Sequence, residues 1–304
     1  MRILVTGSNG LLGQKLVHAL RVRTDVELIA TSIGANRVPE TEGYSYASLD
    51  ITNRQQVLDA VAEHRPNVLI NTAAMTHVDK CVADKEGCWK LNVTAVEHLV
   101  EACEANNVHL LHLSTDFIFD GEAGPYRETD GPNPVSYYGE SKLAAERVVE
   151  KAQCSWAIAR TVLVYGVTES MSRSNVVLWA KGALEKGEPI RVVNDQFRTP
   201  TLSEDLAAGC IQIAEQKATG IYHLSGKDFM SVLELVQRVA DHFGLDASIA
   251  TPISSEALNQ PAKRPPITGF VLDKARTELG YAPRNFEEGL DVVARQVERL
   301  QQNN

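Results

Sequence analysis

The stretch TGSNGLLG, residues 6–13, decides the fold of the N-terminal half of this chain. It follows a short β-branched run at residues 3–6 and leads directly into a segment with helical spacing at residues 11–20. Its glycines lie three residues apart: Gly7, Gly10 and Gly13. Glycines at this spacing let the backbone turn tightly and approach a pyrophosphate, which the helix N-terminus then binds. The stretch therefore predicts a dinucleotide-binding loop, and an ordinary tight turn is the alternative.

Outward from this loop, strand-like and helix-like blocks alternate over the first 160 residues. Strands are predicted at residues 3–6, 26–31, 68–71, 108–113 and 156–160, and helices at 11–20, 53–64, 86–106 and 136–151. Alternation of this kind is typical of an α/β fold in which a doubly wound parallel sheet carries helices on both faces. We therefore expect residues 1–165 to form a Rossmann-type NAD(P)-binding domain.

The rhythm weakens after residue 165. Helical patterns are predicted at residues 174–186, 203–216, 231–243 and 286–302, short strands at 190–193 and 221–224, and a proline-rich loop at 251–266. Because no linker separates the halves, we expect a smaller, interleaved α/β substrate-binding domain. Its residues would be mainly 166–304, with residues 190–225 contributing to the first domain.

The bulk composition restricts the partners of the protein. The 304 residues carry a net charge of −9, and 44% of them are hydrophobic. An acidic chain argues against nucleic acid or an anionic membrane as a partner, because both attract basic surfaces. No signal peptide is recognisable and no apolar run reaches the ~18 residues of a membrane span. The sequence thus predicts a cytoplasmic globular protein.

The metal-binding residue types form no cluster in the sequence. The five cysteines are scattered and none are in a CxxC pair, which indicates reduced, buried thiols. His109 and His112 lie three apart in a predicted strand, so their side chains point to opposite faces. The sequence therefore predicts no metal site.

The end of the second strand bears on the choice of nicotinamide cofactor. An NAD-preferring protein has an acid about 20 residues past the glycines, where it binds the ribose hydroxyls. This chain has Thr31, Ser32, Asn36 and Arg37 in that region. Hydroxyls and an arginine suit a 2′-phosphate, so the residues favour NADP(H), with NAD(H) possible. A solvated loop with one unrelated arginine is the alternative.

A second contact to the cofactor is predicted at the end of the run YASLDI. Asp50 could accept a hydrogen bond from the adenine amino group while Ile51 packs on the ring. The alternative is that Asp50 caps the helix that follows.

The stretch YYGESK, residues 137–142, pairs a tyrosine with a lysine. Tyr138 and Lys142 are four residues apart and share one helix face, whereas Tyr137 is rotated away and is expected to pack or face solvent. A free tyrosine has a pKa near 10, and an ammonium one turn away would lower it towards the working range of an acid. Tyr138 is therefore the predicted proton donor, and an ordinary helix surface is the alternative.

Hydroxyls stand near this pair in the predicted sheet. Ser114 and Thr115 begin the run STDFIFDG and follow directly on a predicted strand. They are therefore expected at the carboxyl edge of the sheet, where ligands of parallel sheets bind. A hydroxyl, a phenol and an ammonium beside a phosphate-binding loop make a site for hydride transfer to a keto group.

These motifs resemble those of the extended short-chain dehydrogenase/reductase family. TGSNGLLG, LDI, INTAA, STD and YGESK stand in that family's order, and the likeness covers nearly the whole chain. The dTDP-4-dehydrorhamnose reductase branch is the most similar. Its motifs look like NTAAMTHVDK at 71–80, STDFIFDG at 114–121, VVNDQFRTPT at 192–201 and PAKRP at 261–265.

The resemblance implies NADPH- or NADH-dependent reduction of a 4-keto sugar nucleotide. It implies Thr115, Tyr138 and Lys142 as catalytic residues, and also a homodimer and Mg²⁺. The cofactor-binding residues are expected to be Gly7, Asn9, Gly10, Leu11, Leu12, Gly13, Ser32, Arg37, Asp50, Ile51, Ala73, Ala74, Asn92, Tyr138 and Lys142. The substrate contacts are expected to be Thr76, Phe117, Leu163, Phe197 and Arg264.

The chain departs from that branch mainly on the substrate side. Phe117 stands where the branch has tyrosine, Leu163 where it has tryptophan, and Arg198 where it has glycine. Val82 replaces an acid, and the run RPPIT at 264–268 replaces R-P-x-x-S. Arg264 could bind a diphosphate or lie on a surface loop, and Phe197 could line the sugar site or fill the core.

Two other functions remain open at this stage. One is a non-catalytic NADP-binding protein resembling the regulatory beta subunit of methionine adenosyltransferase, which belongs to the same branch. The other is a nucleotide-sugar epimerase or dehydratase. Because Phe117 is not an acid, a dehydratase is the less favoured of these.

Overall fold

A seven-stranded parallel sheet forms the centre of the larger half. The computed structural model describes residues 1–169 and 174–302. In the sheet the strands run in the order β11-β6-β5-β4-β1-β2-β3, and every neighbouring pair is parallel. The strands are β1 (Arg2–Thr6), β2 (Glu27–Ser32), β3 (Ser45–Ser48), β4 (Val68–Asn71), β5 (His109–Thr115), β6 (Trp156–Thr161) and β11 (Gly220–His223). The predicted doubly wound Rossmann-type sheet is confirmed.

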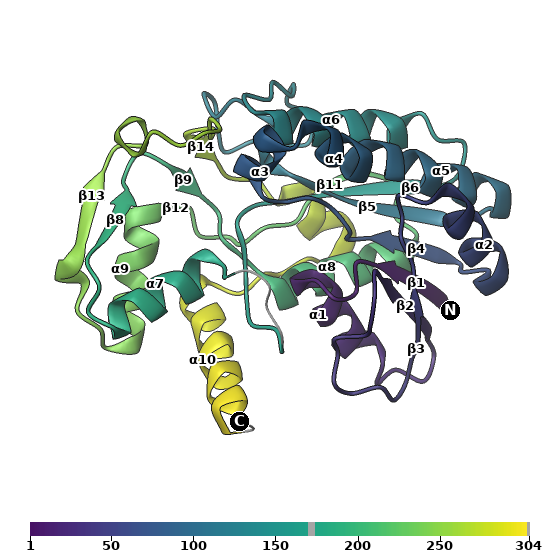
Figure 1. Ribbon diagram of the computed structural model, residues 1–304, viewed down its shortest axis with the longest axis horizontal. Coiled ribbons are helices and arrows are strands. Elements are labelled where there is room, and N and C mark those ends of the chain that lie inside the picture. Colours follow the sequence, from purple (N-terminus) through teal and green to yellow (C-terminus); the bar gives the residue numbers. More distant parts are fainter. Residues whose placement is uncertain (170–173, 303–304) are drawn as a thin grey trace.

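Helices cover both faces of this sheet, as Figure 1 shows. On one face α1 (Leu11–Leu20) and α8 (Ser203–Gln216) pack on the strands. On the other face lie α2 (Arg54–His64), α5 (Ala95–Asn106) and α6 (Tyr137–Glu150). The central strands are buried on both faces: all four positions of β4 are buried, and three of them are apolar.

Strand order reverses between β1 and β4, and this point positions the site. The chain leaves β1 towards β2 and leaves β4 towards β5, so the loops after β1 and β4 diverge and open a crevice. Ligands of doubly wound sheets bind in such a crevice at the carboxyl edge. The glycine loop follows β1 there, and Thr72 to Ala74 follow β4.

The smaller half has its own core. It contains α7 (Val176–Glu185), α9 (Val232–Phe243) and α10 (Phe286–Gln302), which pack around Leu235, Val239 and Leu290. Short strands complete it: β7 (Val164–Tyr165) with β10 (Thr201–Leu202), β8 (Ile190–Val193) with β13 (Ala250–Ile253), and β9 (Phe197–Arg198) between β12 (Met230–Ser231) and β14 (Ile267–Thr268). In Figure 1 these elements lie to the left of the main sheet.

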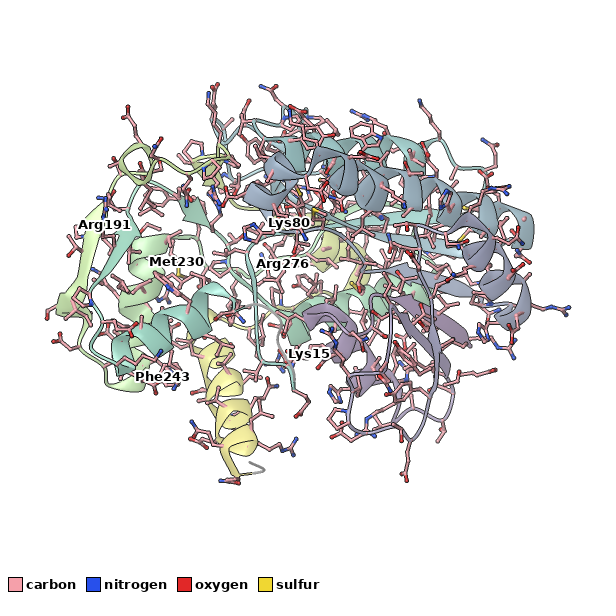
Figure 2. All side chains as sticks on the ribbon, viewed as in Figure 1. Lys15, Lys80, Arg191, Met230, Phe243 and Arg276 are labelled. Atoms are coloured by element: carbon pink, nitrogen blue, oxygen red, sulfur yellow. The ribbon has the colours of Figure 1, made fainter. Side chains whose placement is uncertain are left out.

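The two halves interleave along the chain. Strand β11 belongs to the main sheet and helix α8 packs on it, although both follow β8 of the smaller half in sequence. Lys15 of α1, labelled in Figure 2, pairs with Glu204 of α8 at 2.9 Å and donates to Gln296 of α10 at 3.1 Å. The domain boundary at residue 165 stays a prediction. Its second domain includes residues 170–173 and 303–304, which lie outside the described residues.

Some elements differ from the sequence prediction. Residues 190–193 form β8, which pairs with β13 in the smaller half and takes no part in the main sheet. The segment predicted as one helix at 86–106 is α4 (Lys85–Trp89), the π-helical turn η1 (Lys90–Thr94) and α5. The loop predicted at 251–266 contains most of β13 and the 3₁₀ turn η4 (Glu256–Leu258).

The short elements were the hardest to predict. Helix α3 (Val78–Ala83) and the 3₁₀ turns η2 (Asp116–Ile118) and η3 (Ala247–Ile249) are brief, as is the π turn η5 (Ala275–Leu279). A segment of this length shows little periodicity, so tertiary contacts rather than pattern decide its conformation.

Candidate active site

The glycine loop has the backbone that its three glycines require. Gly7 has a φ of +70°, and a Cβ there would lie 2.8 Å from the backbone nitrogen of Ala73. A Cβ on Gly13 would lie 2.2 Å from the carbonyl oxygen of Gly7. At Gly10 only that same oxygen, at 3.2 Å, comes close. Gly7 and Gly13 are thus required by the fold of the loop, whereas Gly10 leaves its outer side open to a ligand.

The first helix begins at this loop with free backbone donors. Gly10 is the N-cap of α1, no side chain caps it, and no acidic residue lies in its first turn. The N–H groups of Leu11 and Leu12 therefore lie at an uncapped helix N-terminus, the arrangement that binds phosphate.

Asn9 ties the glycine loop to the segment after β2. Its side-chain amide donates to the carbonyl of Ala35 at 2.9 Å and accepts from the backbone N–H of Arg37 at 2.9 Å. The backbone of Arg37 is thereby held beside the glycine loop while its side chain is exposed, and Ser32 ends the neighbouring strand. The sequence predicted each residue but not this clamp, because hydrogen-bonded partners 26 and 28 positions apart leave no local pattern.

Asp50 and Ile51, whose contact with the adenine stays a prediction, lie between β3 and α2. The Asp50 carboxylate accepts from the backbone N–H and the hydroxyl of Thr52, while Asn53 caps α2. The alternative that Asp50 caps the helix is therefore wrong. Ile51 is buried in the core beneath α2 and α5, so most of its side chain packs against the protein.

Helix α6 brings the tyrosine and lysine to the edge of the sheet. Ser136 caps it by accepting from the backbone N–H of Gly139 at 3.2 Å. A Cβ on Gly139 would lie 2.1 Å from the carbonyl oxygen of Phe117, so this glycine lets α6 pack directly on η2. That close packing places Tyr138 next to Thr115, at the end of β5.

Tyr138 is a buried phenol with one hydroxyl neighbour. Its side chain is 7% exposed and its ring packs edge-on against Phe117, with centroids 5.6 Å apart. Burial raises the pKa of Tyr138, and a hydrogen bond with Thr115 counteracts that rise. Tyr137 instead lies half-buried, and its hydroxyl donates to the carbonyl of Lys85 at 3.3 Å.

Lys142 lies on the same helix face but is directed at β5. Its Nζ donates to the carbonyl of Leu113 at 2.7 Å and lies 3.1 Å from Nε2 of His112. Burial lowers the pKa of Lys142 to about 8. Burial raises the pKa of Tyr138 above its ordinary value, so the expected net lowering of that pKa is not what this arrangement produces. Nζ points at β5 instead of the phenol.

Thr115 is oriented by a buried acid. Its hydroxyl donates to Asp116 at 2.9 Å and accepts from the backbone N–H of Phe117 at 3.3 Å. The other Asp116 oxygen accepts from Thr268 and lies 3.9 Å from Nε of Arg198. Burial raises the pKa of Asp116, and the nearby Arg198 lowers it. Ser114 is also buried, and its hydroxyl has no protein partner.

Arg198, which stands where the related branch has glycine, is a buried connector. Its guanidinium donates to the carbonyls of Phe197 at 2.7 Å, Pro265 at 2.7 Å and Pro266 at 3.0 Å. It thereby holds the proline segment against β9 and near Asp116. The departure from the pattern is thus accommodated by carbonyl acceptors that the adjacent prolines provide.

Asn92 was predicted to bind the cofactor, and its amide is already satisfied within the protein. It lies in the π turn η1, accepts from Met75 N–H at 2.8 Å, and donates to the Met75 carbonyl at 3.1 Å and to Ser141 at 3.0 Å. Asn92 therefore joins the loop after β4 to α6. The π turn, a feature common at functional sites, directs this side chain inward.

The predicted substrate residues lie on both sides of the crevice. Thr76 is exposed after β4, where Ala73 and Ala74 are half-buried. Leu163 has a φ of +40° and contacts the cores of both halves. Phe197 stacks on Phe229 with ring centroids 5.8 Å apart, so it pairs with an exposed aromatic side chain rather than filling the core.

A hollow of about 340 Å³ lies beside this region. Gln196, Lys263 and Arg264 line it, and the buried amide nitrogen of Gln196 has no partner in the protein. Arg264 also pairs with Asp79 of α3 at 2.7 Å, which joins the two halves. Asp120 and Glu256 also line the hollow, so its formal charges balance. The amide nitrogen of Gln196 is a donor left for a ligand oxygen.

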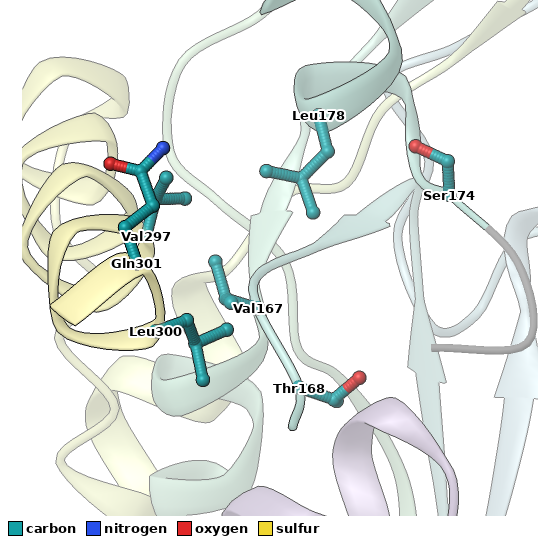
Figure 3. Close-up of a pocket in the computed structure, with 7 residues that line it drawn as sticks. All are labelled: Val167, Thr168, Ser174, Leu178, Val297, Leu300 and Gln301. Atoms are coloured by element: carbon teal, nitrogen blue, oxygen red, sulfur yellow. The ribbon is translucent and has the colours of Figure 1, made fainter. Parts of the chain in front are cut away.

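A second hollow, of about 380 Å³, lies apart from these residues (Figure 3). Val167, Leu178 and Val297 line it, and it opens between α7, α10 and the segment after β7. Thr168, Ser174 and Gln301 add polar groups to this lining, and no residue of the predicted site belongs to it.

Across residues 1–169 and 174–302, no three His, Cys, Asp or Glu side chains are arranged to hold a metal ion. The Mg²⁺ that the resemblance implies stays a prediction, because Mg²⁺ needs only one or two carboxylates besides water and substrate phosphates. All five cysteines are free and buried. None of the described helices is long and apolar enough to cross a bilayer.

Comparison with known proteins agrees with this geometry. The family described as RmlD substrate binding domain matches residues 1–299. A dTDP-4-dehydrorhamnose reductase of Aggregatibacter actinomycetemcomitans is 30% identical over 96% of this chain and 98% of its own. Methionine adenosyltransferase 2 subunit beta of Danio rerio is also 30% identical, over 91% of this chain and 84% of its own.

Solved structures show the same fold. A dTDP-4-dehydrorhamnose reductase from Clostridium acetobutylicum has a TM-score of 0.87 and 31% identity, covering 98% of this chain and 100% of its own. The Bacillus anthracis dTDP-4-dehydrorhamnose reductase, crystallised with NADP, has a TM-score of 0.83 and 28% identity over 97% of this chain and 99% of its own.

Proposed function

The chain belongs to the RmlD substrate binding domain family, and on that premise we propose that it is an NADPH-dependent reductase of dTDP-4-dehydrorhamnose, a 4-keto sugar nucleotide. The main support is the meeting of Thr115, Tyr138 and Lys142 at the carboxyl edge of the sheet, beside an uncapped helix N-terminus. This arrangement would provide a phosphate site and a proton donor within one crevice.

The glycine loop is the proposed seat of the cofactor diphosphate. The N–H groups at the start of α1 would bind it, and Gly10 leaves room for the close approach. Arg37, held there by Asn9, would bind the 2′-phosphate and favour NADPH over NADH. When bound, the cofactor supplies the hydride.

Tyr138 is the proposed acid. Its phenol gives a proton to the keto oxygen as negative charge develops there, and the Thr115 hydroxyl donates to the same oxygen. Thr115 now donates to Asp116, so it must rotate towards the substrate. Thr268 and Arg198 remain with the Asp116 carboxylate, which is therefore not left unpaired. Lys142 would hold the cofactor ribose and stabilise the phenolate.

The 340 Å³ hollow is the proposed site for the rest of the sugar nucleotide. Lys263 and Arg264 would bind the diphosphate, and the unpaired Gln196 amide would donate to a carbonyl or hydroxyl oxygen. Asp195 is not free for this purpose, because it accepts from the backbone N–H and the hydroxyl of Ser255.

The test is NADPH oxidation with dTDP-4-dehydrorhamnose, followed as loss of NADPH absorbance. Tyr138→Phe removes the proton donor and should lower kcat at least 100-fold, roughly the worth of general acid catalysis, while NADPH still binds. Tyr137→Phe removes a hydroxyl from the adjacent, half-buried position, where it bonds only the Lys85 carbonyl, and should leave kcat unchanged. Equal losses in both variants, or full activity in Tyr138→Phe, would contradict the assignment.

A second candidate is a non-catalytic NADP-binding regulatory subunit. The match to Danio rerio methionine adenosyltransferase 2 subunit beta favours it, as do Phe117 and Leu163 on the substrate side. It predicts NADPH binding with no turnover of any 4-keto sugar nucleotide. An epimerase would keep NAD through purification, so the absorbance of the pure protein separates that alternative.

A further inference from the structure

A chain of buried hydrogen bonds runs from the glycine-loop strand to Lys142. Asn71, at the end of β4, accepts from the Thr6 hydroxyl at 2.6 Å and from the Ala73 N–H at 3.3 Å. Its amide nitrogen lies 3.1 Å from Nδ1 of His112, whose Nε2 lies 3.1 Å from Nζ of Lys142. The side chains of Thr6, Asn71, His112 and Lys142 are at most 2% exposed, so water does not compete for these bonds.

The backbone fixes the direction of this chain. The Ala73 N–H can only donate, so the Asn71 oxygen faces it and the amide nitrogen faces His112. That nitrogen also can only donate, so Nδ1 of His112 must carry a lone pair. Burial lowers the pKa of His112 and keeps its ring neutral. The one ring proton is therefore on Nε2, where it points at Lys142.

This direction bears on the charge of Lys142. An ammonium has no lone pair, so it would place an N–H against the N–H of His112. An uncharged amine accepts from His112 and donates to the Leu113 carbonyl, which satisfies both contacts. The neutral form is thus the one that completes the chain.

Other charged and titratable groups also face Lys142. Glu146 on α6 favours the ammonium, but Arg160 of β6 pairs with that carboxylate at 2.7 Å. Cys88 on α4 also favours the ammonium. Burial outweighs both and lowers the pKa of Lys142. The orientation of these hydrogen bonds disfavours the ammonium of Lys142 as burial does.

We propose that Asn71 and His112 are positioning residues that fix the direction of the hydrogen bond at Lys142 Nζ and favour the uncharged amine in the unliganded protein. The inference rests on the proposed function, because it concerns the lysine of that site. In the proposed reaction Lys142 stabilises the phenolate of Tyr138, and for this it must be an ammonium. Turnover should therefore fall as pH rises through the titration of Lys142.

The direct test is the tautomer of His112, measured by ¹⁵N NMR on the unliganded protein. We expect Nε2 to carry the proton and Nδ1 to be unprotonated, and a proton on Nδ1 would overturn the proposal. His112→Gln identifies the signals by their loss. His109→Gln, on the opposite face of the same strand, is the matched control and leaves them in place. This measurement needs no turnover, so a failure of the proposed reductase activity does not affect it.

The second test reverses the chain without changing its shape. Asn71→Asp still accepts from Thr6 and Ala73, but it presents an acceptor to Nδ1 of His112. The ring proton then moves to Nδ1, and Nε2 accepts from the Lys142 ammonium. We expect the alkaline limb of kcat/KM to move up by at least about one pH unit, a tenfold change in proton affinity. A lower rate with an unmoved limb means a merely structural role and overturns the proposal.

Discussion

The ion pair between Glu146 and Arg160 fixes the helix that carries Tyr138 and Lys142. Glu146 lies one turn beyond Lys142 in α6, and both of its oxygens accept from Arg160 of β6, at 3.0 and 2.7 Å. The side chains are 0% and 3% exposed. Glu146→Gln keeps the shape but leaves the guanidinium without a countercharge. Breaking a buried pair in this way costs about 3–5 kcal/mol of unfolding free energy.

The same helix provides a matched control. Arg147 and Glu150 form an ion pair of similar length, 2.6 Å, but their side chains are 52% and 23% exposed. Because water and salt screen an exposed pair, Glu150→Gln should cost at most about 0.5 kcal/mol. The two variants therefore differ mainly in the burial of the pair they break.

Urea titrations of both variants measure the difference. We expect a midpoint well below that of the parent protein for Glu146→Gln and an almost unchanged midpoint for Glu150→Gln. The double variant Glu146→Leu, Arg160→Met should recover most of the loss, because it removes both charges. Similar costs for the two single variants would refute the argument that burial makes the difference. Glu146→Gln should also lower the pKa of Lys142, whose ammonium the carboxylate favours.

Three further predictions concern the cofactor loop and the lysine. Gly13→Ala should raise the Kd for NADPH at least tenfold, about 1.4 kcal/mol, because its Cβ would lie 2.2 Å from the Gly7 carbonyl oxygen; Gly182→Ala, which meets no atom within 4 Å, is the control in the same titration. Arg37→Ala should weaken NADPH binding about tenfold and leave NADH binding unchanged, and equal losses would argue against a 2′-phosphate contact. Lys142→Met should raise the unfolding free energy by about 3 kcal/mol. Burial lowers the pKa of Lys142 from 10.5 to about 8, and the substitution removes the cost of burying that charge. That gain is complete below pH 8 and disappears as pH rises towards 10.5, which urea titrations at several pH values measure.

Much of the first half of the fold could be predicted from short-range pattern. The strands of the main sheet are runs of apolar residues, and the glycine loop follows the first of them within a few positions. Gly7 and Gly13 are recognisable because a local turn and a local helix require them. Tyr138 and Lys142 are recognisable for the same reason, since a four-residue spacing fixes a shared helix face.

The prediction was weaker where contacts are long-range. Residues 190–193 have the pattern of a strand, but only the partner strand β13 decided that they lie outside the main sheet. Residues 86–106 have one continuous helical pattern, which does not show the π turn that interrupts the helix. In the fold this turn directs the amide of Asn92 inward to Ser141. Periodicity predicts which residues of a segment face the core, but it does not predict which distant segment packs against them.

The sequence by itself determined the α/β fold class, the glycine loop and the shared helix face of Tyr138 and Lys142, because each depends on residues a few positions apart. Only the tertiary structure decided the direction of the Lys142 amine, because its partner His112 comes from another strand. The same holds for Arg198, two of whose three carbonyl acceptors lie 67 and 68 positions away. A hydrogen bond needs two groups within about 3 Å at a suitable angle, and for distant residues only the folded chain sets that distance and angle.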